Sequence, residues 1–198
     1  KLMCKFSEDS RQKLGNAVIY IANHTEQLSK TKLLKLLFLM EEYMVKRYHV
    51  PFMGLPFEIW QAGPVAKDIF IDLSDGPFLL KDFVKTEVQK DATYIRAIKP
   101  FCDDEFSDCE MEMMDEIIRK YGKKTAKQLV AEVHKEGSLW FNAAKKHGLL
   151  TAFNKGLCNN SDYTIDFSEE LSDCAREDYK ESLAIHQTAN ILKAQEHV

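Results

Sequence analysis

Residues 32–40 read KLLKLLFLM and form the most apolar stretch of the chain. Apolar side chains occupy every face of a helix here, which predicts a helix that is buried on all sides. The flanking pattern places its ends at about Ser29 and Tyr48, and Pro51 and Gly54 follow shortly afterwards. Because proline cannot continue a helix and glycine permits a turn, the chain turns after this segment. We therefore expect the other elements to pack around this helix.

Helical periodicity and capping signals predict further helices on both sides of the central one. They are expected at about Ser10–His24, from Gly63–Pro64 to Leu73, at Ser107–Tyr121, Thr125–Lys135 and Ser138–His147, and from a cap at Ser168 towards the C-terminus. Ser10 is the expected N-cap of the first helix, and Ser107 with Glu110 forms a capping box. Pro64 is expected in the first turn of its helix, where a missing N–H costs nothing.

β-Branched and aromatic residues predict a short strand at Phe57–Trp60 and a hairpin of Phe83–Gln89 with Thr93–Lys99. The hairpin is the clearest β unit, and the polar segment Asn154–Asp166 is expected to be a loop. The fold class is therefore α+β: a mainly helical single domain over residues 1–198 with a small antiparallel sheet.

Composition narrows the classes of function. Lys and Arg total 27 against 31 for Asp and Glu, a net charge of −4, so a general nucleic-acid binder is not expected. No apolar run is long enough to span a bilayer, and the first residues lack the apolar core of a signal peptide, which favours a cytoplasmic protein. The five cysteines show no zinc-ligand spacing, so we expect reduced, structural thiols and neither metal nor cofactor.

Two local charge imbalances stand out. The stretch from Cys102 to Ile118, which contains Asp103 and Glu116, holds eight acidic residues and no Lys or Arg. It is either solvated surface that suits a helix N-terminus or a face that steers a basic partner. Lys30, Lys32 and Lys35 begin the central helix and would face phosphates in a helix-turn-helix. That DNA-binding alternative is weak because the helix is apolar all round.

Motifs that would indicate an enzyme are absent: there is no dinucleotide or phosphate loop, no HExxH and no GxSxG. A small hydrolase would need Cys102 or Cys109 as nucleophile and His134 as base, but a packed thiol is the simpler interpretation. Glu41 shares a helical face with apolar residues, so its carboxylate must be paired, hydrogen-bonded or at the edge of a cleft. An ordinary ion pair is the simpler reading of Glu41, and a partner-binding acid is the alternative.

Two ordered motifs resemble one known family. The first is the KLL-type helix followed by Tyr48, Pro51, Gly54 and the step FEIWQAGPV over residues 57–65. The second follows at the expected distance, where HKEGSLW covers residues 134–140. Together they are similar to the SocA-like antitoxin family, also described as the Panacea domain, over about Ser10–Leu150. The chain departs from the pattern at Leu139, where many members have Pro, and residues 151–198 form a C-terminal extension with a long helix.

The resemblance implies a non-enzymatic protein that binds and neutralises a toxin encoded nearby, in some cases as an adaptor to an ATP-dependent protease. The motif residues, together with Glu41 from its apolar helical face, form the candidate set for partner binding, with no catalytic or metal-binding residue. The set is Glu41, Trp60, Gly63, Pro64, His134, Glu136 and Trp140. For the tryptophans and the Gly63–Pro64 step, a structural role is the simpler interpretation, and partner contact is the alternative.

Overall fold

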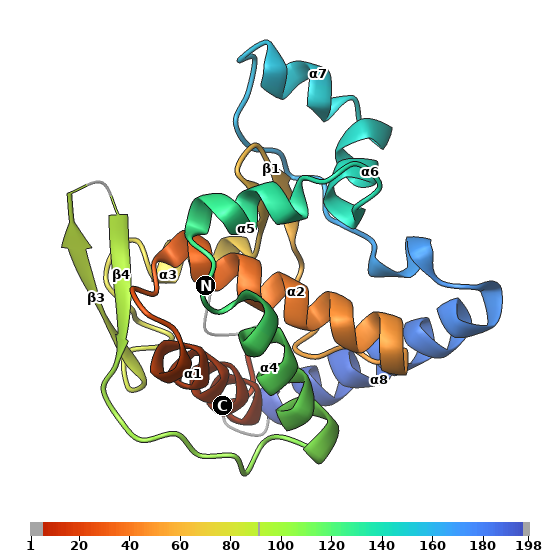
Figure 1. Ribbon diagram of the computed structural model, residues 1–198. Coiled ribbons are helices and arrows are strands. Elements are labelled where there is room, and N and C mark those ends of the chain that lie inside the picture. The colour runs from red at the N-terminus through yellow and green to blue at the C-terminus, as the bar shows by residue number, and fades with distance from the viewer. Residues whose placement is uncertain (1–5, 91, 196–198) are drawn as a thin grey trace.

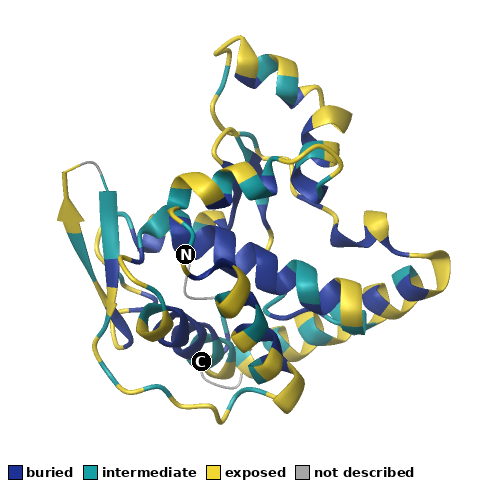
Figure 2. Ribbon diagram, viewed as in Figure 1, coloured by how far each residue is buried: buried dark blue, intermediate teal, exposed yellow. Residues whose placement is uncertain are grey.

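Helix α2 (Lys30–Tyr48) is the centre of the fold, and most of the other elements lie around it (Figure 1). The computed structural model describes residues 6–90 and 92–195. Figure 2 shows α2 buried along most of its length, and Leu33 to Glu41 are all buried, as the apolar run predicts. Its N-cap is Ser29, whose hydroxyl accepts a hydrogen bond from the amide of Lys32. The prediction of a central, all-round buried helix is confirmed.

The remaining elements give a mainly helical α+β fold, as predicted. The helices are α1 (Glu8–His24), α3 (Lys67–Asp72), α4 (Asp108–Tyr121), α5 (Ala126–Val133), α6 (Leu139–Lys146), α7 (Leu149–Asn154) and α8 (Asp173–Gln195), with the 3-10 helix η2 (Phe167–Glu170). The strands are β1 (Glu58–Trp60), β2 (Gly63–Val65), β3 (Val84–Gln89) and β4 (Ala92–Ala97). Side-chain caps begin α4, α5 and α6 at Ser107, Thr125 and Ser138, but α1 is capped by Ser7 rather than by Ser10.

The Gly63–Pro64 step is a strand, so the prediction of a helix with Pro64 in its first turn is wrong. β2 pairs antiparallel with β1, with Ile59 opposite Pro64, and α3 begins only at Lys67. The amide of Ile59 donates to Tyr163 O on the other side of β1, so the Ile59–Pro64 pair exchanges no backbone bond. The ladder therefore does not need the N–H that proline lacks. The β3–β4 hairpin is present as expected, but β1–β2 is a second β unit.

The segment expected to be a loop is held against β1. Ile59 N donates to Tyr163 O, Gln61 N to Asn159 O, and Ile165 N to Phe57 O, each at 2.8–2.9 Å. Helix α7, which the sequence did not predict, lies just before this region and ends at its first residue, Asn154. The segment after α7 is a loop, as predicted, apart from one isolated bridge between Thr164 and Glu58, and its backbone bonds to the edge of β1.

The long C-terminal helix begins later than expected. Ser168 lies in η2, where its amide donates to the side chain of Asp166, and the extended Leu171 separates η2 from α8. Ala175 and Tyr179 in α8 are buried in the core. Residues beyond 150 thus contribute to the same core as α2.

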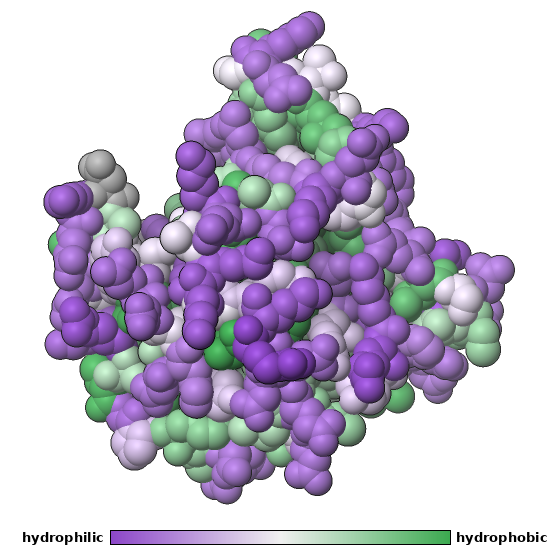
Figure 3. Space-filling view, viewed as in Figure 1, coloured by the Kyte–Doolittle hydropathy of each residue, from purple (hydrophilic) through white to green (hydrophobic). Residues whose placement is uncertain are grey.

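The surface seen in Figure 3 is covered mainly by hydrophilic side chains, with smaller apolar areas between them. Within the described part of the chain, no helix combines the length and the apolar character that a membrane crossing requires. Cys102, Cys109, Cys158 and Cys174 are free thiols, as expected, but three of them are exposed, so the prediction of packed thiols is wrong for these. Cys4 lies outside the described residues.

Candidate functional site

The Gly63–Pro64 step is joined to α2 by a buried lysine. Lys35 is 1% exposed, and its Nζ donates to the carbonyl oxygen of Pro64 at 2.8 Å. Burial lowers the pKa of Lys35 to about 7, because a charged ammonium is costly in an apolar interior. The lysine therefore ties β2 to the central helix and is unavailable to solvent.

Gly63 occupies a backbone conformation that favours glycine, with a φ of +99°. A Cβ atom at this position would lie 2.8 Å from Lys35 Cε and 3.0 Å from Val133 Cγ2. Both the backbone angle and the close approach of α2 and α5 exclude a side chain here. Close packing therefore explains why glycine occupies this position of the motif.

Trp140 and His134 form a stacked pair next to β1. Their ring centroids lie 3.8 Å apart, and Trp140 Nε1 donates to the carbonyl oxygen of Trp60 at 3.0 Å. His134 Nε2 is buried and has no hydrogen-bond partner among the described residues. Burial, with a smaller contribution from Lys35, lowers the pKa of His134 to about 4, so its ring is neutral at pH 7.

The structure therefore brings five of the proposed motif residues together, and they differ in exposure. Gly63, Pro64 and Trp140 are buried, whereas Trp60 and His134 are partly exposed. Trp60 Nε1 donates to Glu58 at 2.8 Å, and its ring packs edge-on against Phe70. Glu136 lies on the exposed turn after α5.

Glu41 lies elsewhere and forms no ion pair with any other described residue, so the expected ion pair is not found. Its carboxylate, 1% exposed, accepts hydrogen bonds from the amides of Phe52, Met53 and Gly54 at 2.8–3.2 Å. Burial raises the pKa of Glu41 to about 7, and these three amides oppose that rise. Glu41 therefore fixes the loop that follows α2.

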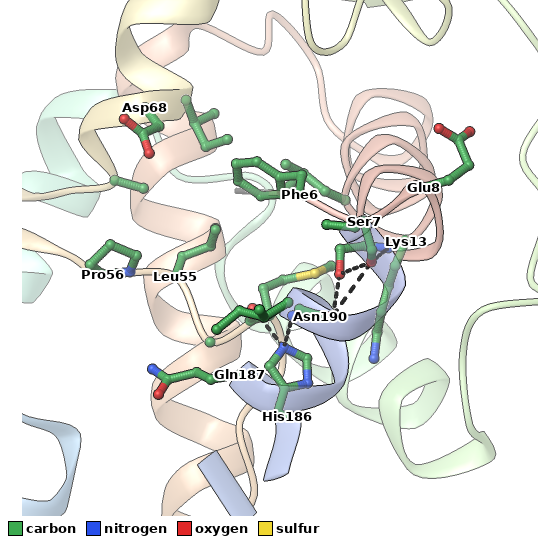
Figure 4. A pocket seen from close by; sticks show the side chains of 18 of the residues that line it. Phe6, Ser7, Glu8, Lys13, Leu55, Pro56, Asp68, His186, Gln187 and Asn190 are labelled. Atoms are coloured by element: carbon green, nitrogen blue, oxygen red, sulfur yellow. Dashed lines mark hydrogen bonds between the residues drawn. The ribbon is translucent and has the colours of Figure 1, made fainter. Parts of the chain in front are cut away.

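The loop fixed by Glu41 forms one wall of a groove of about 1360 Å³ (Figure 4). The start of α1, the loop 53–56, the start of α3 and the last turns of α8 line it. His186 Nε2 donates to Met53 O at 3.1 Å, and Ser10 Oγ donates to Asn190 Oδ1 at 2.7 Å, so polar contacts join α8 to the opposite walls. Sequence reasoning missed this groove because no local pattern shows where the end of α8 packs.

The acidic stretch borders this groove. Lys13 lines the groove, and its ammonium pairs with Glu110 of α4 at 2.5 Å. The hydroxyl of Tyr43 donates to Glu116 at 2.6 Å, and that of Tyr20 donates to Asp115. The carboxylates with neither an ion pair nor a side-chain hydrogen bond to another described residue lie at the start of the stretch and on α4. They are Asp103, Asp104, Glu105, Asp108 and Glu112.

The lysines of the DNA-binding alternative do not form a basic surface. Lys32 is buried and donates to the carbonyl oxygen of Gly122, and Lys35 is held by Pro64. Lys30 donates to Ser74 and lies over the ring of Phe70.

The structure does not bring together the groups that a hydrolase would need. No contact between described residues links His134, Glu41 and a cysteine. In the same part of the chain, no cluster of His, Cys, Asp and Glu has the arrangement of a metal site.

We expect stability to rise with pH above 7 because of Lys35. Its pKa is about 7 when folded and 10.5 when exposed, so the unfolded chain binds more protons between these values. The free energy of unfolding should therefore increase towards pH 10, by up to about 1.4 kcal/mol per pH unit. His134 is neutral throughout this window and does not contribute. Urea titrations of the wild type and of Lys35→Met, at several pH values from 7 to 9.5, measure the effect.

The change of the unfolding free energy with pH tests this prediction, because the substitution can shift the absolute stability in either direction. The difference in unfolding free energy between wild type and Lys35→Met should grow with pH in favour of the wild type. Parallel curves would show that Lys35 keeps an ordinary pKa in the folded protein.

Comparison with known proteins identifies the class. The family model of the antitoxin SocA-like, Panacea domain matches residues 33–141, from the first turn of α2 into α6. These 109 residues are more than half of the 198-residue chain, and they contain all seven motif residues. The chain therefore belongs to the SocA-like, Panacea-domain family of antitoxins. No curated protein shows a significant match to it. No solved structure does so either.

Proposed function

We propose that this chain is the antitoxin of a toxin–antitoxin pair and neutralises its toxin in the cytoplasm by direct, stoichiometric binding. The observation that carries the proposal is the family match, which spans both sequence motifs. An antitoxin of this kind works by occupying its partner, or by handing it to an ATP-dependent protease, and needs no catalytic residues of its own.

The proposed toxin-binding surface combines the groove with the acidic stretch beside it. The groove offers apolar wall residues such as Leu55, Pro56 and Ile191. The exposed carboxylates from Asp103 to Glu112 supply negative charge next to it, because Glu110 contacts Lys13 on the groove wall. Such a surface fits a partner with a cationic face and an apolar segment that enters the groove.

The motif residues divide into two roles in this proposal. Gly63, Pro64 and Trp140 are buried and hold the scaffold, and buried groups cannot contact a partner directly. Trp60, His134 and Glu136 retain exposed surface and are proposed as a second contact area. Glu41 acts on binding only through the loop that lines the groove.

The proposal is tested by co-expression with the adjacent open reading frame. The neighbour alone should arrest growth, the pair should grow normally, and the two proteins should co-purify. A neighbour that is harmless alone, or one that remains toxic while both proteins are soluble, would contradict the antitoxin function. The half-life of the toxin, with and without this chain, separates occlusion from delivery to a protease.

The rate of association with the toxin tests the proposed surface directly. Changing Asp103, Asp104 and Asp108 to Asn should lower the association rate constant for the toxin roughly tenfold at low salt, with little change in dissociation. A matched control neutralises Glu177, Asp178 and Glu181 on the first half of α8, which removes the same charge elsewhere. Equal effects of the two triple variants would show that net charge, rather than this surface, governs the encounter.

A further inference from the structure

Strand β3 leaves one edge of its sheet open. Its partner β4 is paired on both sides, because it forms the hairpin with β3 and also pairs with Leu28 and Ser29 before α2. β3 is the outermost strand in Figure 1, and no other strand of the described chain pairs with it. An open edge presents backbone donors and acceptors to any extended chain that can align with it.

The hydrogen-bond pattern shows which residues face this open edge. Ile95 of β4 donates its amide to Leu28 O at 2.8 Å, so its backbone groups point away from β3. Ile95 lies opposite Thr86, which makes this a pair without mutual backbone bonds. The N–H and C=O of Thr86 therefore point outwards, and those of Val84 and Val88 follow at the period of two. The amide of Val84 is used by Leu80 O, whereas nothing described bonds to the backbone of Thr86 or Val88.

The sequence of β3 is complementary to itself in one antiparallel register. With Thr86 opposite Thr86 of a second copy, Lys85 lies opposite Glu87, and Val84 lies opposite Val88. This register also places outward-facing residues opposite each other, as hydrogen-bonded antiparallel pairs require. Opposite charges directly across a sheet stabilise it, and like charges destabilise it.

The exposure of these side chains agrees with such a pairing. Val88 is 74% exposed, although valine favours a covered position in a sheet. Its counterpart Val84 is already buried at 1% exposure, so on pairing Val88 gains cover from the backbone of the second strand rather than from the Val84 side chain. On the opposite face, Lys85 and Glu87 lie 3.4 Å apart at the surface, and Arg96 also pairs with Glu87. The carboxylate of Glu87 is thus positioned on the face where a second Lys85 would arrive.

We propose that two copies of this chain associate through their β3 edges, antiparallel and centred on Thr86, to form one four-stranded sheet. The pairing is isologous, since each copy contributes the same residues to both sides. It involves no residue of the proposed toxin-binding surface, so it holds whether or not that function is confirmed. Because the interface is small, we expect a weak dimer that dissociates on dilution.

Sedimentation velocity of the full chain, from low to several hundred micromolar, tests the proposal. The wild type should shift from monomer to dimer over this range. Thr86→Pro should remain monomeric, because it removes an outward N–H and leaves the hairpin bonds in place. Thermal melts followed by circular dichroism verify that the variant is folded. A wild type that stays monomeric, or a dimer that Thr86→Pro does not weaken, would overturn the proposal.

A charge-swap experiment tests the register independently of proline. Lys85→Glu alone places acids opposite acids, and Glu87→Lys alone places lysines opposite lysines, so each variant should dimerise at least tenfold more weakly. An equimolar mixture restores both opposite-charge pairs and should recover a heterodimer. Lys127→Glu on the exposed face of α5 is the control for net charge and should dimerise as the wild type does. A mixture that remains monomeric would refute this register.

Discussion

Replacing Trp140 with alanine should lower the free energy of unfolding by about 3–5 kcal/mol. The indole is 4% exposed and stacks between His134 and Phe153, so truncation leaves a cavity as well as losing buried area. The substitution also removes the Nε1 donor that satisfies the carbonyl oxygen of Trp60. Urea unfolding followed by far-UV circular dichroism measures the loss.

Two variants show where this loss originates. Trp140→Phe retains an aromatic ring but not the donor, so it should lose less than Trp140→Ala. Trp60→Ala should also be milder, because Trp60 is partly exposed and its Nε1 reaches Glu58 at the surface. A Trp140→Ala protein as stable as the wild type would place this ring outside the core and return it to the list of partner contacts.

Replacing Gly63 with alanine should cost about 2–6 kcal/mol, the sum of an unfavourable backbone angle and a steric collision. The new Cβ would have to displace Lys35 and Val133, and Lys35 has no space because its Nζ is held by Pro64. The collision would separate β2 from α2 at the point where the motif crosses the central helix. Chemical denaturation again provides the measurement.

Gly137 provides the matched control for Gly63→Ala. It also has a positive φ, +83°, but a Cβ there would meet nothing within 4 Å. Gly137→Ala should therefore show the backbone cost alone, about 1–3 kcal/mol. If the two alanine variants lost the same stability, the close approach of Lys35 would contribute nothing to the loss at Gly63.

Local signals predicted most helix boundaries correctly, since capping depends on residues close in sequence. Ser29, Ser107, Thr125 and Ser138 each accept a bond from an amide three residues on, as their sequence context indicates. The exception is Ser10, where Ser7 takes the cap instead. Pro64 was misassigned for a related reason. Proline suits both a first helical turn and a strand position without a ladder bond, and only the partner strand distinguishes them.

The candidate site was only partly predictable. The position of Glu41 on an apolar helical face predicted that its carboxylate needs a partner. Its actual partners are backbone amides of the loop that follows α2. The motif residues around Gly63 and Trp140 were identified from the resemblance of the two motifs to the SocA-like family. The groove was not, because its walls come from the two ends of the chain and from segments between them.

The sequence by itself determined the buried central helix, the caps of most surrounding helices and the motifs that place the chain among the antitoxins. These features depend on neighbours within a few turns, where periodicity and hydrogen bonding are local. Only the tertiary structure decided that Lys35 is buried, that residues 159–165 extend β1, that α8 closes the groove and that β3 is left as an open edge. Each of these depends on which distant surfaces meet, and the free energy of that packing is not contained in any single segment.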